Sequence, residues 1–343
     1  MRKGDGKSTE MIRKNRVVIV GCGKIAGLME DKLVRHPYSH ATAFYNNSSF
    51  IISGCVDSDH IKAKKFSEKY SIDVQGDNIE KIIDHIQPHV ISICTPDDTH
   101  FDIVKRVLTN KQHSLKLIFL EKPVCSTVEE LDEIISMSEV SGTPVLVNMS
   151  RRYHPWYRHL REQYDKQKLG DLIRGDIFYS GGWRHNGVHA LDTIEFLFPS
   201  QSSMGEIQEY WGGRDKNDPT YTVSMKLNQN GAPIWFHGFN ENYYGIFDCD
   251  LKFTGGRLRI TNYEEEIRWE KVSINSLGER VLIRGDLQFP TVRKSCIEEA
   301  VILIQNYLHF LEKNELEGYR VQDIVATMRT IWAVDEKRND GSY

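Results

Sequence analysis

The sequence predicts an α/β protein in which a doubly wound parallel sheet is followed by an α+β domain with a mainly antiparallel open sheet. Two observations predict this class. Short runs of β-branched residues alternate with amphipathic segments in the first half, and longer stretches alternate polar and apolar residues in the second half. With 343 residues and 40% hydrophobic content, the chain is long enough for two domains of ordinary size.

Five buried parallel strands are expected in the first half, at residues 17–20, 51–56, 90–94, 117–120 and 145–147. Amphipathic segments at residues 61–70, 79–86, 101–109 and 127–140 are predicted to be the connecting helices. Because parallel strands need such crossovers, this order predicts a doubly wound sheet over residues 16–148. Residues 1–15 are polar and basic, and we predict that they form a disordered leader.

The second half, residues 149–343, is predicted to be the α+β domain. Strands are expected at residues 220–227, 233–239, 248–253 and 257–260, with turns at Asn230-Gly231 and Gly255-Gly256. Two helical runs, at about residues 295–315 and 321–334, end the chain.

Charge, cysteine content and hydropathy argue against several classes of protein. A net charge of -4 leaves no broad basic surface for a nucleic acid. The six cysteines are spread singly, so neither a disulfide framework nor a zinc knuckle is indicated. No stretch approaches the roughly 20 apolar residues of a membrane helix, and no signal-peptide core is seen. We therefore expect a cytoplasmic protein with no membrane or nucleic-acid partner.

A glycine-rich turn directly follows the first predicted strand. Gly21 and Gly23, with Ala26 in the place of a third glycine, stand in the order of a Rossmann dinucleotide fingerprint. Gly21 permits a tight turn, and Gly23 lets backbone N–H groups approach a pyrophosphate, which the N-terminus of the next helix also favours. Lys24 and Ile25 are expected to line the same site. A glycine turn in some other α/β protein remains the alternative.

Asp57, at the end of the second predicted strand, is the expected partner of the adenosine ribose hydroxyls. Its carboxylate would repel a 2′-phosphate, so NAD is favoured over NADP. The spacing from the glycines exceeds the usual ~20 residues, because residues 28–38 are interpreted as an inserted loop. Asp57 could also be an ordinary turn residue at a strand end.

Further motifs follow in a recognisable order. Thr95-Pro96 with His100, and Glu121-Lys122-Pro123, stand at the carboxyl ends of predicted strands, where open sheets bind ligands. Later come Asn148 with 151–153 (Arg-Arg-Tyr) and the run 187–192, which has the pattern G-x-H-x-x-D. With the glycines, these motifs resemble the Gfo/Idh/MocA family (glucose-fructose oxidoreductase and inositol dehydrogenase) over nearly the whole chain from Arg16.

The resemblance implies an NAD(P)-dependent dehydrogenase or reductase acting on CH–OH groups of a sugar-like substrate. It implies that Lys122 and His189 are the catalytic pair and that the Lys122-Pro123 peptide is cis. It also places Glu121, Thr95, Pro96 and His100 near the cofactor. The chemistry agrees, since hydride transfer from a carbinol needs a base within reach of the hydroxyl, and an imidazole titrates near neutral pH. Lys122 would hold the same oxygen. The alternatives are a surface lysine and a core histidine.

Substrate contacts are expected from the segments around the second set of motifs. The candidates are His185, Asp192, Arg152, Tyr153, Trp183 and Arg184. Asp192 could bind substrate hydroxyls or orient the imidazole. Guanidinium and aromatic groups suit an anionic sugar, such as a nucleotide-linked sugar or a sugar acid, although such residues also occur at ordinary domain interfaces.

One position departs from the family. Many members carry aspartate four residues before the catalytic histidine, and this chain has His185, which cannot supply a carboxylate charge. His185 and His189 also have the spacing of a zinc pair, but Asn186 follows His185 where a zinc peptidase needs glutamate, so no metal is predicted.

Two other functions remain open from the sequence. One is an NAD-dependent glycosidase on the same fold, and the other is a non-catalytic regulator that binds a dinucleotide. Both Lys122 and His189 argue against the regulator, whereas His185 keeps it open. By family analogy, the open sheet face is expected to form a homodimer or homotetramer.

Overall fold

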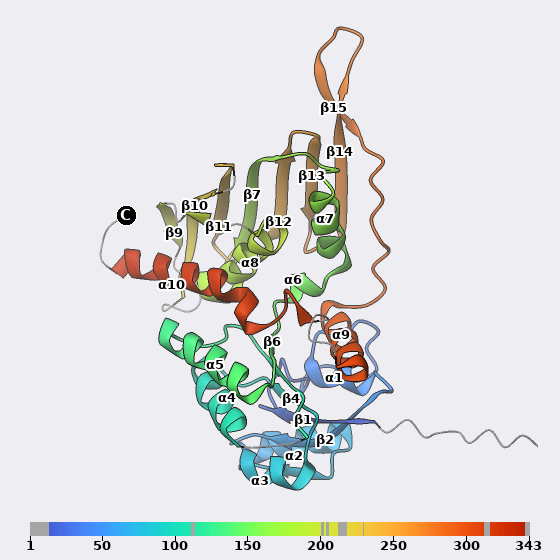
Figure 1. Cartoon of the computed structure of the whole chain (residues 1–343), viewed down its shortest axis with the longest axis vertical. Coiled ribbons are helices and arrows are strands. Elements are labelled where there is room, and N and C mark those ends of the chain that lie inside the picture. Colours follow the sequence, from blue (N-terminus) through green and yellow to red (C-terminus); the bar gives the residue numbers. More distant parts are fainter. Residues whose placement is uncertain are drawn as a thin grey trace, which may run out of the picture.

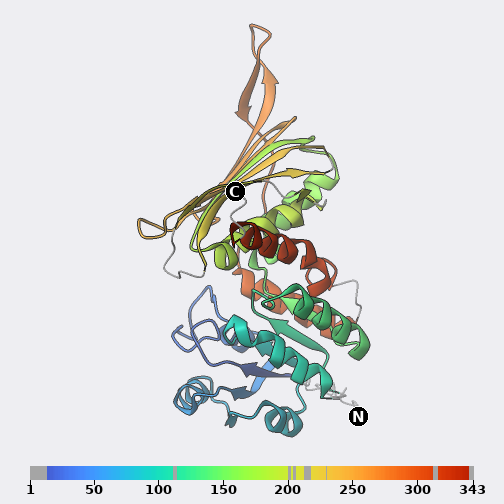
Figure 2. The same cartoon turned by 90° about the vertical axis from the view of Figure 1, so that its left-hand side faces the viewer.

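The computed structural model describes residues 14–110, 114–199, 202–203, 206–211, 218–228, 230–311 and 316–339. Two sheets form two stacked layers, with helices between them (Figures 1 and 2). Residues 1–13 of the predicted leader lie outside the described residues, and the first strand already begins at Asn15.

The first sheet has six parallel strands in the order β3-β2-β1-β4-β5-β6. In chain order they are β1 (Asn15–Val20), β2 (Phe50–Val56), β3 (Val74–Gly76), β4 (Val90–Ile93), β5 (Leu117–Leu120) and β6 (Val145–Val147). This is the order of a doubly wound dinucleotide-binding sheet. The prediction of that sheet is confirmed, and β3 is the one strand of it that the sequence interpretation missed.

Helices cover both faces of this sheet. In chain order they are α1 (His40–Tyr45), α2 (His60–Tyr70), α3 (Ile79–Ile86), α4 (His100–Thr109) and α5 (Val128–Ser141). Three of them begin at a capping side chain: Asp59, Asn78 and Thr127 each accept a backbone N–H of the first turn. Val17 and Ile19 point into one buried cluster and Val18 and Val20 into the other, as alternation along a strand requires.

The segment after the glycines differs from the expected pattern. The chain makes a single turn, in which Leu28 N–H donates to the Gly23 carbonyl (3.0 Å), and helix α1 begins only at His40. Gly27 ends this turn with a positive φ of 123°. The predicted helix N-terminus at the pyrophosphate position is therefore replaced by one turn of backbone.

The second sheet has nine strands and is mainly antiparallel, as predicted. The path is β15-β14-β13-β12-β7-β11-β10-β8, β9 pairs with β10, and β7 and β11 are parallel. The strands are β7 (Leu172–Ser180), β8 (Ser202–Ser203), β9 (Ile207–Trp211), β10 (Thr220–Leu227), β11 (Pro233–Phe239), β12 (Phe247–Phe253), β13 (Gly256–Thr261), β14 (Glu266–Ile274) and β15 (Arg280–Arg284).

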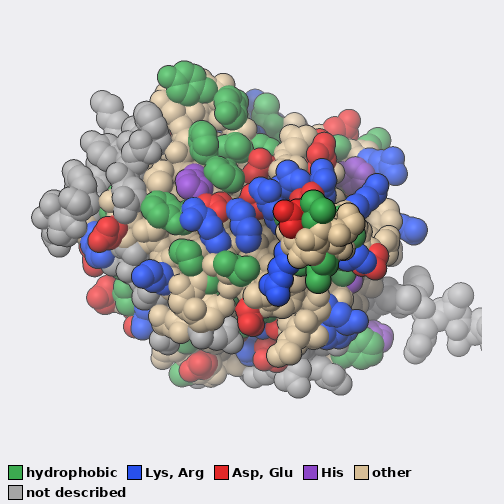
Figure 3. Space-filling view, turned by 90° about the horizontal axis from the view of Figure 1, so that it is seen from above, with side chains coloured by type: hydrophobic (Ala, Val, Ile, Leu, Met, Phe, Trp, Pro, Cys, Tyr) green, Lys and Arg blue, Asp and Glu red, His purple; other side chains and the backbone are tan. Residues whose placement is uncertain are grey.

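One face of the second sheet packs on helices and the other is open. On β12, Phe247, Cys249, Leu251 and Phe253 are buried, while the residues between them are half-buried on the open face. The open face carries ion pairs, for example Lys252 with both Asp176 (2.8 Å) and Asp250 (3.1 Å). Seen from above, Lys and Arg side chains gather on the surface with acidic and hydrophobic side chains around them (Figure 3). The face is therefore amphipathic.

Short helices lead from the first sheet into the second domain: α6 (Ser150–Tyr153), α7 (Pro155–Asp165) and α8 (Val188–Leu197), the last preceded by a π-helical turn at Trp183–Gly187. The closing helices are α9 (Cys296–Phe310) and α10 (Val325–Asn339), with a 3₁₀ turn at Val321–Ile324. Helix α9 packs on the first sheet, since Ile297, Val301 and Ile304 share a buried cluster with Val17 and Ile19.

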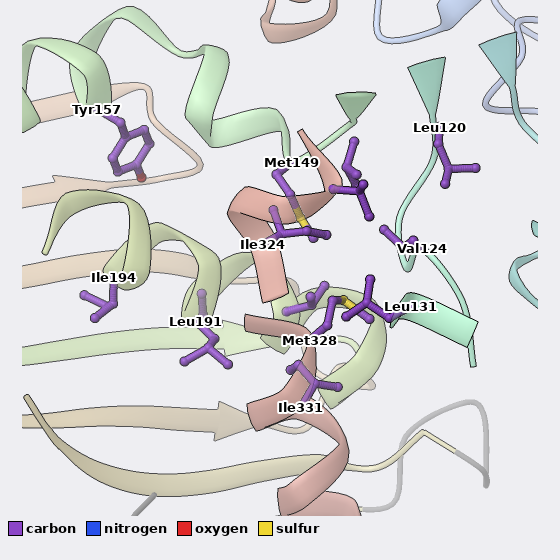
Figure 4. Close-up of a cluster of buried hydrophobic side chains, with 14 of the residues drawn as sticks. Leu120, Val124, Leu131, Met149, Tyr157, Leu191, Ile194, Ile324, Met328 and Ile331 are labelled. Carbon is purple, nitrogen blue, oxygen red and sulfur yellow. The ribbon is translucent and has the colours of Figure 1, made fainter. Parts of the chain in front are cut away.

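Helix α10 and the 3₁₀ turn before it join the two layers. Ile324, Met328 and Ile331 lie against Leu131 and Leu191 in one continuous hydrophobic cluster (Figure 4). Because this cluster contains strands of both sheets, the domains share part of their core. The boundary between the two domains at residue 148 remains a prediction from the sequence.

Candidate functional site

A groove of about 600 Å³ lies at the carboxyl edge of the first sheet, and its lining includes Gly21, Gly23, Asp57, Thr95 and Pro96. Gly21 has a φ of 86°, and a Cβ there would lie 2.8 Å from the backbone of Cys94 and Thr95. Only glycine allows the β1 and β4 loops to meet this closely. A Cβ on Gly23 would meet nothing within 4 Å, so the backbone here is open to a ligand.

Asp57 lies at the groove, half-buried at the end of β2. Its carboxylate accepts the N–H of Cys22 (2.7 Å) and of Asp59 (2.8 Å), which fixes its orientation. A fixed carboxylate beside a glycine turn fits the ribose of a dinucleotide. Lys24 is exposed, and Ile25 packs partly against the buried cluster; neither lines the groove.

His100 is buried under the loops rather than in the groove. Its ring lies between the carbonyl oxygens of Pro123 (2.7 Å) and Thr95 (2.9 Å). It therefore ties the loop after β4 to the loop after β5, and we assign it a positioning role.

Glu121 points into the protein. Its carboxylate binds His40 Nε2 (2.7 Å) and the Asn148 amide (2.5 Å), and the other ring nitrogen of His40 is 2.8 Å from the Ser92 hydroxyl. Burial lowers the pKa of His40, but contacts with Cys94 and Glu121 outweigh this and raise it to about 10. Burial opposes ionisation of Glu121, yet the His40 contact lowers its pKa. The sequence interpretation missed His40, because the insertion separates it from the glycine motif.

Lys122, after β5, and His189, in α8, lie near each other, because Lys122 binds the turn that leads into α8. Lys122 stands shortly after β5, and its peptide bond to Pro123 is cis, as the resemblance implied. Its ammonium donates to the His185 carbonyl (2.8 Å). His189 is in the first turn of α8. Burial, then the charge of Lys122, lowers the pKa of His189 well below its usual value. Burial also lowers the pKa of Lys122. The imidazole of His189 is therefore neutral at neutral pH.

A carboxylate that the sequence interpretation missed supports this pair. Asp218 accepts the backbone N–H of Arg184 (2.7 Å) and of His185 (3.0 Å), and so holds the π-helical turn whose carbonyl binds Lys122. Burial raises the pKa of Asp218 to about 6. A Cβ on Gly182 would lie 2.1 Å from this carboxylate, so glycine is needed there.

Comparison with protein families decides the identity of the first domain. Residues 15–149 match the family model described as "Oxidoreductase family, NAD-binding Rossmann fold" (GFO_IDH_MocA). The domain belongs to the Gfo/Idh/MocA oxidoreductase family. The predictions of an oxidoreductase and of a nicotinamide-dinucleotide cofactor are thereby confirmed at the level of the class.

Several known proteins resemble this chain over a larger part of its length. The D-glucoside 3-dehydrogenase of Escherichia coli is 25% identical over 348 residues, covering 91% of this chain and 94% of that protein. The inositol 2-dehydrogenase of Rhizobium meliloti is 26% identical over 173 residues, covering 46% and 50%. A 3-ketoreductase from Actinomadura kijaniata, solved with NADP and TDP-benzene, has a TM-score of 0.73 at 12% identity, covering 94% and 98%. This last likeness is one of fold.

Asp192 and Arg152 form a buried ion pair. Arg152 Nε and Nη2 donate to the Asp192 carboxylate at 2.7–3.1 Å, and Thr327 adds a third donor group at 3.2 Å. The side chains are 4% and 2% exposed. Asp192 therefore neither orients His189 nor faces open space, and we assign both residues to support of the domain junction.

Three further candidate residues also have protein partners. Tyr153 is buried, with its hydroxyl donating to the Val147 carbonyl (2.8 Å). Trp183 is fully buried and donates to the Ile331 carbonyl (3.1 Å). Arg184 binds Asp335 (2.6 Å). Among the residues predicted to contact substrate, His185 is exposed, and its carbonyl accepts a hydrogen bond from Lys122.

The described ranges show neither a cluster of metal ligands nor a membrane-spanning helix. Among these residues, no three His, Cys, Asp or Glu side chains meet in a way that could hold a metal ion. No helix among them is long and apolar enough to cross a membrane.

Proposed function

We propose that this chain transfers a hydride between a nicotinamide dinucleotide and a hydroxyl or keto carbon of a sugar-like substrate. The observation that supports the proposal is that Lys122 binds the turn leading into α8, where its charge acts on the neutral imidazole of His189, while the loop after the neighbouring strand β4 lines the groove. The bound cofactor would supply the hydride acceptor or donor.

The two side chains would divide the proton chemistry. His189 is neutral at neutral pH, so it can accept the hydroxyl proton of the substrate. Lys122 would hold the same oxygen and stabilise its alkoxide character, releasing the His185 carbonyl that it binds in the free protein. In the reverse direction, the same groups return the proton to a carbonyl oxygen.

We further propose that NAD is preferred over NADP. Asp57 presents a carboxylate where a 2′-phosphate would lie. The cations of the groove, Lys62 and Arg106, already have carboxylate partners, Asp59 at 3.8 Å and Glu80 at 2.6 Å. A tighter dissociation constant for NADP than for NAD would contradict this assignment.

The proposed function is tested with the whole purified protein. Mass spectrometry should detect carried-over dinucleotide, and a screen of sugars, sugar acids and nucleotide-linked sugars at 340 nm should find a substrate. A glycosidase of the same family would release free sugar from a glycoside with no net change at 340 nm. A regulator would bind the dinucleotide and turn over no sugar.

The amphipathic open face of the second sheet suggests how copies of the chain associate. We propose a cytoplasmic homodimer or homotetramer built on this face. Light scattering of the purified protein measures the assembly directly, and a monomer at micromolar concentration would contradict it.

A further inference from the structure

A second buried cation, Arg151, stands beside the catalytic pair. Its side chain is 11% exposed, and its charge lowers the pKa of both Lys122 and His189. Its Nε donates to Glu264 Oε1 (2.7 Å), and its Cζ lies 3.2 Å from the centroid of the Phe247 ring. Within the described ranges, all hydrogen bonds from this guanidinium start at Nε. Both Nη groups therefore keep their donors for another partner.

A strained turn holds the Glu264 side chain against Arg151. Asn262, Tyr263 and Glu264, between β13 and β14, have consecutive φ values of 55°, 51° and 64°. Three adjacent non-glycine residues in the left-handed region are costly, and such strain gathers at functional sites. The turn is secured by the Asn262 N–H, which donates to Asp248 (2.8 Å). The Tyr157 hydroxyl donates to the same Glu264 oxygen (2.9 Å). One edge and one face of the guanidinium are thus fixed.

Three carboxylates around the catalytic pair already have protein partners. Glu264 accepts from Arg151 and Tyr157, and Asp218 accepts two backbone N–H groups. Asp192 is paired with Arg152. The imidazole of His189 has no carboxylate partner among the described residues, and His185 occupies the position of the family's usual aspartate. Asp97 and Asp218 still supply negative charge near Lys122, so the part of the site without a carboxylate is the one around His189 and the Nη groups of Arg151.

We propose that the Nη groups of Arg151 bind the carboxylate of a sugar-acid substrate, such as a uronate. This inference rests on the proposed function and names its substrate class. A planar guanidinium held at one edge presents parallel donors that match a carboxylate. Because Arg151 is close to Lys122 and His189, the group that it binds must be close to the oxidised carbon. A carboxylate on the sugar ring itself lies within a few bonds of that carbon. The diphosphate of a nucleotide-linked sugar is farther from the oxidised carbon and carries two negative charges. Arg151 is a single cation that is already paired with Glu264.

The test compares a uronate with its methyl ester and with the corresponding neutral sugar, using the whole NAD-loaded protein. We expect kcat/KM for the uronate to exceed that for both neutral compounds by about 100-fold. Arg151→Gln should remove that advantage, so that within this variant kcat/KM for the uronate falls to or below kcat/KM for the neutral sugar. Arg151→Lys should restore only part of it, because an ammonium lacks the fork. Arg158→Gln is the matched control. Arg158 lies on the neighbouring helix α7, and its guanidinium is paired with Glu299 of helix α9.

A binding measurement separates the two proposals. Titration calorimetry of glucuronate into each protein should show weaker binding for Arg151→Gln and unchanged binding for the control, while NAD binds both. Equal kcat/KM for acid and ester in the unaltered protein, or an Arg151→Gln protein that keeps the preference, would overturn the Arg151 assignment while hydride transfer stands. If NAD binds but no sugar of any class is turned over, the proposed function itself fails.

Discussion

Replacement of Asp192 by asparagine distinguishes a structural carboxylate from a substrate-binding one. The change keeps the shape of the side chain and leaves the Arg152 charge buried without its counterion. Arg152 keeps neutral acceptors alone: the carbonyls of Gly318 (2.6 Å) and Asp323 (3.1 Å) and the amide oxygen of the new asparagine. Breaking one partner of a buried ion pair costs about 3–5 kcal/mol. For a domain of this size, each kcal/mol lowers Tm by roughly 2–4 °C. We therefore expect Tm to fall by about 6–20 °C.

The assay is thermal unfolding of the protein without ligand, followed by circular dichroism. Asp132→Asn is the matched control, because Asp132 pairs with Arg329 at 3.0 Å but both side chains are 54% exposed. That exposed pair should contribute under about 1 kcal/mol. At a temperature where Asp192→Asn is folded, its KM should stay within a few-fold of the unaltered value. A normal Tm together with a large rise in KM would refute the structural assignment and return Asp192 to the substrate site.

Three further changes test the site. Gly21→Ala would push a Cβ to 2.8 Å from the backbone of Cys94 and Thr95, so we expect NAD binding to weaken at least about tenfold by calorimetry, and unchanged binding would refute this. Lys122→Met should lower kcat by about 10²–10⁴-fold while NAD still binds; turnover within a few-fold would remove it from the catalytic pair. Burial lowers the pKa of His154 from 6.5 to about 4, so the unfolded chain takes up the proton first. The free energy of unfolding should therefore fall by about 3 kcal/mol between pH 6.5 and pH 4, as measured by urea denaturation. In His154→Asn this decrease should be smaller.

Strands and most helices could be predicted because each depends on local sequence pattern. The expected strands at 117–120, 145–147, 220–227 and 233–239 agree with β5, β6, β10 and β11 at both ends. β7, the central strand of the second sheet, was missed, since its burial alternates poorly at Ile173 and Arg174. The turn after Gly23 was also misjudged, because propensity does not show that Gly27 stops the helix.

The partners of the site residues could not be predicted, because they come from distant parts of the chain. Arg152 and Asp192 are 40 residues apart, and Arg151 and Glu264 are 113 apart. The order of the motifs predicts that Lys122 and His189 belong to one site. It does not predict which carboxylates bind the cations and backbone N–H groups around them. Asp218 and Glu264 stand in turns with no motif around them, and their roles depend on the fold that brings them in.

Helix α9 has a consequence for how the protein is made. It covers the face of the first sheet that α1 and α2 share, and Asn47 donates to Gln305 (2.8 Å) across a separation of 258 residues. During synthesis, the apolar side chains of that face are not covered by α9 until almost the entire polypeptide has been made. A nascent chain stopped before residue 295 would expose Ile19 and Phe119 and should depend on chaperones. The nucleotide-binding half is translated first but completed last.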